Sequence, residues 1–149
     1  VNHFGFISRM DIIQAAILNF RIKKIDSTVK KRRSNAQFYL NNLDRSFYFI
    51  NDEKKYQFNT YHTFVIQTDK RDKLINFLNK NGIGTAIHYP IPIHLQPASK
   101  YLKYKKGSFP NTEEQSKRIL TIPIHQNLSR ANLSLIVKLM NKFAQQNLK

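Results

Sequence analysis

Three prolines close together constrain the middle of this chain more than any other feature does. Residues 88–97 read HYPIPIHLQP, so two imidazoles, a phenol and an amide alternate with Pro90, Pro92 and Pro97. Proline fixes its own φ, removes a hydrogen-bond donor and pushes the preceding residue toward extended geometry. The segment is therefore predicted to be a stiff, irregular loop that holds polar side chains in place, as binding sites require. The alternative is a proline-rich crossover whose His and Tyr side chains are merely half-buried.

Length and composition limit the class of protein. A chain of 149 residues, 41% of them hydrophobic, has room for one packed domain or a substantial part of a larger one. It contains no apolar run of about 18 residues, so no transmembrane helix is predicted. It begins with Val1, and no basic region followed by an apolar stretch indicates a signal peptide. The absence of cysteine excludes disulfides, thiolate metal sites and a cysteine nucleophile, and a cytoplasmic location is expected.

The charge of the chain is strongly positive. Lys and Arg number 25 against nine Asp and Glu, for a formal net charge of +16. Such a chain attracts nucleic acid, anionic membranes or small phosphorylated ligands. The basic residues are spread along the sequence without a recognition motif, so nucleic-acid binding is not favoured. The cluster at residues 30–33 is interpreted as a solvated helix face.

Hydrophobic periodicity predicts an α/β fold of the α+β type, with a long helix packed on a short mixed sheet. One helix, or two joined near residues 24–26, is expected from about Asp11 to Leu43. Residues 61–67, 70–79 and 84–88 follow as a β-α-β unit. A helix capped by Asn111 or Thr112 should end near Leu120, before an extended piece at 121–124. The apolar face of a last helix, capped by Ser129, consists of Leu133, Ile136, Leu139, Met140 and Phe143. We therefore expect residues 1–45 to form a linking motif and helix, and residues 46–149 a small domain.

Spacing alone identifies no reaction. The five histidines show no i, i+4 pair, and no acidic cluster completes a site for a hard metal ion. A zinc site that uses His88 and His94 would need distant partners. Neither a Gly-x-Ser-x-Gly elbow nor a glycine-rich phosphate loop occurs. From these residues, His125 is interpreted as structural.

Three blocks of sequence, taken together, carry a family resemblance. Residues 5–16 read GFISRMDIIQAA, residues 82–90 read GIGTAIHYP, and residues 109–113 and 118–123 read FPNTE and RILTIP. In order and separation they resemble the C-terminal part of the DegT/DnrJ/EryC1/StrS family of pyridoxal-phosphate-dependent sugar aminotransferases. The stretch at 30–39, with Arg32, Arg33, Ala36 and Tyr39, is also similar to that family. The resemblance spans essentially the whole chain.

The resemblance implies the C-terminal small domain of a fold-type-I transferase that acts as a homodimer. Such enzymes use pyridoxal 5'-phosphate to move an amino group, usually from glutamate, onto a keto-sugar attached to a nucleotide diphosphate. The lysine that carries the cofactor lies in the family's larger N-terminal domain, and none of the 17 lysines here has a matching context. The chain alone is therefore expected to be inactive.

The same resemblance assigns roles to individual residues. His88 and Tyr89 are expected to bind the sugar nucleotide, with His94 and Gln96 as further substrate contacts. The alternative for His94 is that it packs beneath the loop. The family's first block has an asparagine that reaches the cofactor phosphate across the dimer. Ile7 stands at that position, which weakens cofactor anchoring. Arg9 is a candidate for the cofactor-binding site, and its alternative is a pairing with Asp11 at the helix start.

Two other functions stay open from the sequence. One is a truncated, non-catalytic remnant, or a half-protein that pairs with a separate N-terminal partner, as Ile7 and the abrupt start of the sequence indicate. The charge keeps a basic nucleic-acid-binding module as the third possibility.

Overall fold

The elements of the fold follow the predicted order along the chain. The computed structural model describes residues 5, 9–48 and 53–148. The elements are α1 (Ile12–Ile22), α2 (Ile25–Asn42), β1 (Phe64–Gln67), α3 (Arg71–Lys80), the short 3₁₀ turns η1 (Ile93–Leu95) and η2 (Pro97–Leu102), α4 (Pro110–Arg118), β2 (Ile119–Ile122) and α5 (Arg130–Asn147). The combination of helices with a small sheet confirms the predicted fold class. The expected long helix is two helices, which meet at residues 23–24.

The sheet is small, and every described strand pair is antiparallel. β1 pairs with β2 in the register Phe64↔Ile122 to Gln67↔Ile119. Single bridges add Tyr48 beside Gln67 on one edge and Ala86 beside Thr121 on the other. The sheet is thus antiparallel where a mixed one was predicted, because β2 lies between β1 and the segment at 84–88. The two strands of the expected β-α-β unit are therefore not neighbours.

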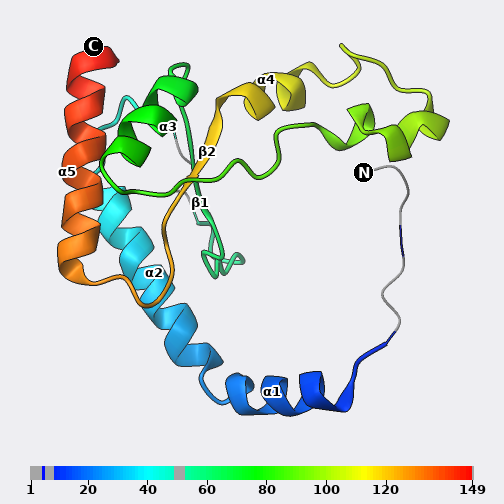
Figure 1. Cartoon of the computed structure of the whole chain (residues 1–149), viewed down its shortest axis with the longest axis vertical. Coiled ribbons are helices and arrows are strands. Elements are labelled where there is room, and N and C mark those ends of the chain that lie inside the picture. The colour runs from blue at the N-terminus through cyan, green and yellow to red at the C-terminus, as the bar shows by residue number, and fades with distance from the viewer. Residues whose placement is uncertain (1–4, 6–8, 49–52, 149) are drawn as a thin grey trace.

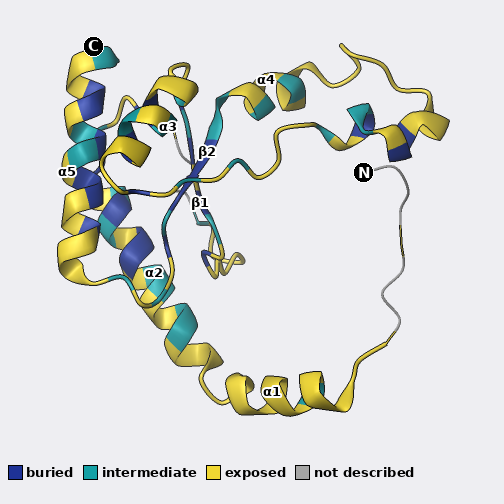
Figure 2. Ribbon diagram, viewed as in Figure 1, coloured by how far each residue is buried: buried dark blue, intermediate teal, exposed yellow. Residues whose placement is uncertain are grey.

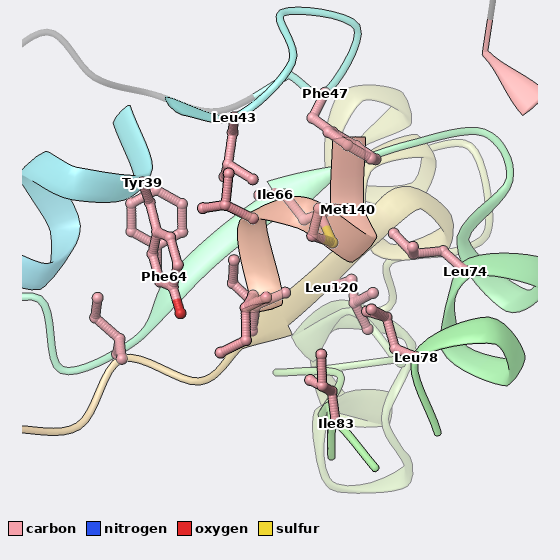
Figure 3. Close-up of a cluster of buried hydrophobic side chains, with 14 of the residues drawn as sticks. Tyr39, Leu43, Phe47, Phe64, Ile66, Leu74, Leu78, Ile83, Leu120 and Met140 are labelled. Carbon is pink, nitrogen blue, oxygen red and sulfur yellow. The ribbon is translucent and has the colours of Figure 1, made fainter. Parts of the chain in front are cut away.

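The hydrophobic core lies where α2, α3 and α5 cover the sheet (Figure 1). Ile66 from β1, Leu120 from β2 and Met140 from α5 have no exposed surface. Figure 3 shows how these side chains converge with those of α2 and α3. Tyr39 meets Phe64 edge-to-face, with ring centroids 5.1 Å apart. The predicted apolar face of α5 is confirmed: Leu133, Ile136, Met140 and Phe143 are buried, and Leu139 is half-buried.

Helix α1 differs from the other long helices because none of its residues is buried. It begins as predicted, with Asp11 as its N-cap and the Asp11 N–H donating to Gln14 Oε1 at 3.2 Å. Its apolar side chains are nevertheless exposed, Ile12 to 88% and Phe20 to 66%. Figures 1 and 2 show this helix extending away from the core.

Helix α4 and the following strand differ slightly from their predicted bounds. Phe109 is the N-cap of α4, and no side chain caps it, so neither Asn111 nor Thr112 has the predicted capping role. Pro110 takes the first helical position, where a missing N–H costs nothing. The helix ends at Arg118, because the next four residues pair with β1 as β2.

Candidate ligand-binding site

The proline-rich segment presents its first two polar side chains to solvent. His88 follows the bridge at Ala86, and its Nδ1 lies 3.1 Å from the hydroxyl oxygen of Thr121 on β2. Tyr89 is 73% exposed, and its ring meets that of His88 edge-to-face with centroids 5.6 Å apart. Because both residues are exposed, the imidazole of His88 and the phenol of Tyr89 are accessible to a ligand.

The other two predicted substrate contacts face the protein. His94 has a side chain only 7% exposed, and its Nε2 lies 2.9 Å from Glu113 Oε1. Its ring packs edge-to-face on Phe109 at 4.8 Å between centroids. The Gln96 Nε2 amide donates to the Ile91 carbonyl at 3.3 Å. In this chain both side chains hold the proline-rich segment in its conformation.

We call His94, Phe109 and Glu113 the clasp, because they join the two ends of the segment between η1 and α4. Glu113 Oε1 also accepts the Gly107 N–H at 2.8 Å and the Phe109 N–H at 3.4 Å. The hydrogen bond from His94 is the main reason that the pKa of Glu113 is lowered, and the two backbone N–H groups act in the same direction.

Three histidines from separate parts of the chain gather in one open groove of about 440 Å³. His62 precedes β1, His88 follows the Ala86 bridge, and His125 follows β2; all three are exposed. The lining, which we call the histidine groove, is Arg32, His62, Thr63, Gly84, Thr85, Ala86, His88, Thr121, Ile122, Pro123, Ile124 and His125. Two of these residues, His62 and His125, were not identified as site residues from the sequence.

One face of α2 builds the groove by holding backbone carbonyls. Arg32 Nη1 donates to the carbonyl of His62 at 2.9 Å and to that of the preceding residue at 3.2 Å. Asn35 Nδ2 donates to the carbonyl of His125 at 3.0 Å, and the Tyr39 hydroxyl to that of Pro123 at 2.7 Å. Positions 32, 35 and 39 lie on one helix face. The sequence analysis named Arg32 and Tyr39 in the family-like stretch at 30–39. Their spacing with Asn35 on one helix face is the signal that could have located the groove.

The chemistry of the lining favours an anionic ligand. It offers one guanidinium, three imidazoles and three threonine hydroxyls, and none of the residues that line it is a carboxylate. Within the described residues no three His, Asp or Glu side chains come together as a metal site. The side chains that line the groove are therefore suited to bind a phosphate or a carboxylate and not a cation.

The lysines of the described residues lie outside the histidine groove. All 16 lysines in the described ranges are exposed, and none lines the histidine groove. Arg9 lies at the start of α1 with its Nε 3.4 Å from Asp11 Oδ1, and both side chains are exposed. Ile7 falls outside the described residues. The residues that line the groove thus fit an anion.

Among the described residues no helix has the length and apolar character needed to cross a bilayer.

Comparison with known proteins identifies relatives over nearly the whole chain. Residues 1–141 match the model of the DegT/DnrJ/EryC1/StrS aminotransferase family. The chain is 32% identical over 145 residues to the "Pleiotropic regulatory protein" of Geobacillus stearothermophilus, covering 93% of this chain and 38% of the relative. It is 31% identical over 139 residues to the "dTDP-3-amino-3,6-dideoxy-alpha-D-galactopyranose transaminase" of Aneurinibacillus thermoaerophilus, again covering 93% and 38%.

A solved structure agrees with these matches. The chain superposes on DesV of S. venezuelae, solved in complex with a ketimine intermediate, with a TM-score of 0.86 at 31% identity. The match covers 95% of this chain and 38% of DesV. The chain therefore spans somewhat more than a third of the length of the relatives that it matches.

Proposed function

Because the chain belongs to the DegT/DnrJ/EryC1/StrS aminotransferase family, we propose that it is the C-terminal portion of an aminotransferase acting on nucleotide-linked keto-sugars. The observation that carries the proposal is the family match over residues 1–141, in a chain that spans 38% of its relatives. Relatives named as transaminases of dTDP-linked amino sugars support the substrate class. Glutamate is the proposed amino donor, and the cytoplasm the proposed location.

His88 and Tyr89 are the proposed substrate contacts from this chain. Both are exposed and adjacent, and a phenol and an imidazole N–H donate to sugar or phosphate oxygens. His94 and Gln96 are proposed to support the same site by holding the loop that carries His88 and Tyr89. The clasp and the Gln96 amide fix the loop, so that the two contact residues are positioned before the substrate arrives.

The cofactor of the proposed enzyme is pyridoxal 5'-phosphate, which supplies an electron sink when bound. We propose that this chain alone does not react with it, because none of the described lysines lines the groove. The test is to add the cofactor to the purified chain and follow the absorbance of a lysine-bound form. No band is expected. A band that borohydride traps on one lysine would refute the proposed inactivity.

The exposed face of α1 supports a requirement for a further protein segment. Met10, Ile13, Ile17 and Phe20 recur at helical spacing and are 52–75% exposed, an apolar stripe that a stable protein usually covers. We propose that the N-terminal domain of this family, on the same chain or on a separate partner, covers it. The division of this chain at residues 45 and 46 and the active homodimer are parts of the same proposal.

Co-expression tests the partner. The chain is produced with a tagged N-terminal domain from a related enzyme or from the adjoining reading frame, and both co-purification and transamination are measured. Substitution of Ile13 and Ile17 by Glu should abolish co-purification, whereas Leu135→Glu on the exposed side of α5 should not. Failure of the unsubstituted chain to co-purify with either domain would count against the proposal.

Nucleic-acid binding is the least favoured function, because the basic residues are dispersed. Binding of this kind weakens steeply with salt. A titration with duplex and single-stranded oligonucleotides at low salt would detect it.

A further inference from the structure

We propose that the histidine groove is a phosphate-binding subsite, in which His62 and His125 act together with His88 and Arg32. The identity of the ligand that carries the phosphate, a nucleotide diphosphate, rests on the proposed function. The grouping of the four residues does not depend on that function, because the fold itself brings His62 and His125 beside His88 and Arg32. Two of them, His62 and His125, add ligand contacts beyond the proline-rich loop.

The tautomer of His125 makes its second ring nitrogen, Nε2, a hydrogen-bond donor. The Asn127 N–H donates to His125 Nδ1 at 3.3 Å. Nδ1 must therefore be unprotonated, and the ring proton of neutral His125 lies on Nε2. A neutral imidazole N–H can donate to a phosphate oxygen without burying a positive charge.

Side chains of α2 hold the backbone at His125 and at His62. The carbonyl of His125 accepts from buried Asn35, and that of His62 accepts from Arg32 Nη1. Because both partners belong to α2, the backbone positions of the two histidines are tied to one helix. This arrangement reduces the ordering cost of binding a ligand between them.

Electrostatics determine which ligand fits. Arg32 uses Nη1 for the two carbonyls, and its positive charge remains at the wall of the groove. Three threonines supply further hydroxyls, and none of the lining residues would repel an anion. A volume of about 440 Å³ is within the range of small-molecule sites and large enough for a diphosphate.

The experiment uses inorganic pyrophosphate as the probe and the histidine ring protons as reporters. Nuclear magnetic resonance of the whole chain should show saturable shifts of the His62, His88 and His125 signals. His94 is the internal control, because it lies in the clasp and does not line the groove. Absence of saturable shifts, or equal shifts of His94, would overturn the proposal.

Two variants separate a built site from attraction to a cationic surface. The double variant His62→Gln with His125→Gln keeps the net charge at pH 8 and should weaken pyrophosphate binding at least tenfold. Lys31→Gln, on the exposed side of α2, removes a charge outside the groove and should leave the affinity within about twofold. Equal weakening by both would overturn the proposal. Since both histidines are exposed, circular dichroism should show an unchanged fold.

Two further outcomes keep the proposals distinguishable. An oligonucleotide that displaces pyrophosphate from the same three histidines would overturn the assignment to a small molecule. Loss of pyrophosphate binding would refute the groove while leaving the rescue of transamination by an N-terminal domain intact. Failure of that rescue, with the histidine shifts still present, would instead refute the proposed function and retain the phosphate site.

Discussion

Helices α1 and α5 have the same kind of sequence pattern and opposite environments. Both repeat large apolar residues every three or four positions, which predicts one apolar face on each. In α5 that face packs against α2 and α3, and six of its residues are buried. In α1 none is buried. Figure 2 shows the contrast directly, with α1 almost uniformly exposed and α5 striped.

The difference separates two things that periodicity is often taken to predict together. The pattern indicates that a helix has a side to cover, and this holds for both helices. It does not indicate what covers that side. Apolar faces contribute free energy only where water is removed from them, so α5 stabilises this chain and α1 does not.

The largest expected effect comes from truncating the core side of α5. Met140 has no exposed surface, so Met140→Ala should reduce the free energy of unfolding by about 2–5 kcal/mol. The matched change on α1, Ile17→Ala, should cost less than about 0.5 kcal/mol. Urea unfolding followed by circular dichroism measures both. Comparable losses would mean that α1 packs on the core in solution.

The next effect concerns α2, which continues from α1 into the core. Tyr39→Phe removes the hydroxyl that donates to the Pro123 carbonyl and keeps the ring packed on Phe64. We expect a loss of about 1–2 kcal/mol, because the carbonyl is left without its partner. Burial raises the pKa of Tyr39, so its phenol stays protonated through the neutral range. Thermal unfolding of the variant measures the loss, and an unchanged melting temperature would contradict the bond's contribution.

Helices α5 and α1 each have a side-chain hydrogen bond at the N-terminus. Ser129 Oγ accepts the Asn132 N–H at 3.1 Å at the start of α5. Ser129→Ala should cost about 1 kcal/mol of global stability. Gln14→Ala removes the reciprocal contact at the start of α1, in which the third helical residue accepts the N-cap N–H. It should lower helix content slightly without changing the unfolding midpoint, since no residue of α1 is buried. A lower midpoint for the Gln14 variant would show coupling.

The smallest effect is a dependence on pH. Arg33 holds both carboxylate oxygens of Glu53, at 2.9 and 2.8 Å, and lowers the pKa of Glu53 from 4.5 to about 2. Because the folded pKa lies below the unfolded one, this contribution is complete above pH 4.5 and is lost as the pH falls toward 2. Melting temperatures measured across that window should fall less steeply for Glu53→Gln. Parallel curves for the two proteins would exclude a role of this pair in acid stability.

The sequence was sufficient for features that depend on local pattern. The helices and the apolar face of α5 follow from the spacing of apolar residues. The substrate role of His88 and Tyr89, which rests on proline chemistry and family resemblance, stays a prediction. The position of β2 between β1 and residues 84–88 could not follow from such patterns, because strand pairing depends on which segment best fills the centre of the sheet.

The same limit applies to the site. His62 and His125 are 63 residues apart in sequence and carry no motif, so only the tertiary fold brings them together. The family resemblance predicts that His94 is a substrate contact, with packing beneath the loop as the alternative. Its partner Glu113 lies 19 residues further on, and this pairing could not be read from the sequence.

The way in which α2 supports the groove has a consequence for how its specificity can change. Arg32, Asn35 and Tyr39 bind main-chain carbonyls, which every residue type possesses. Replacement of the side chains at 62 and 125 therefore alters what the groove recognises without disturbing what holds it open. Scaffold and selectivity are encoded by different residues, so new ligands can be selected at those two positions while the supporting helix remains the same.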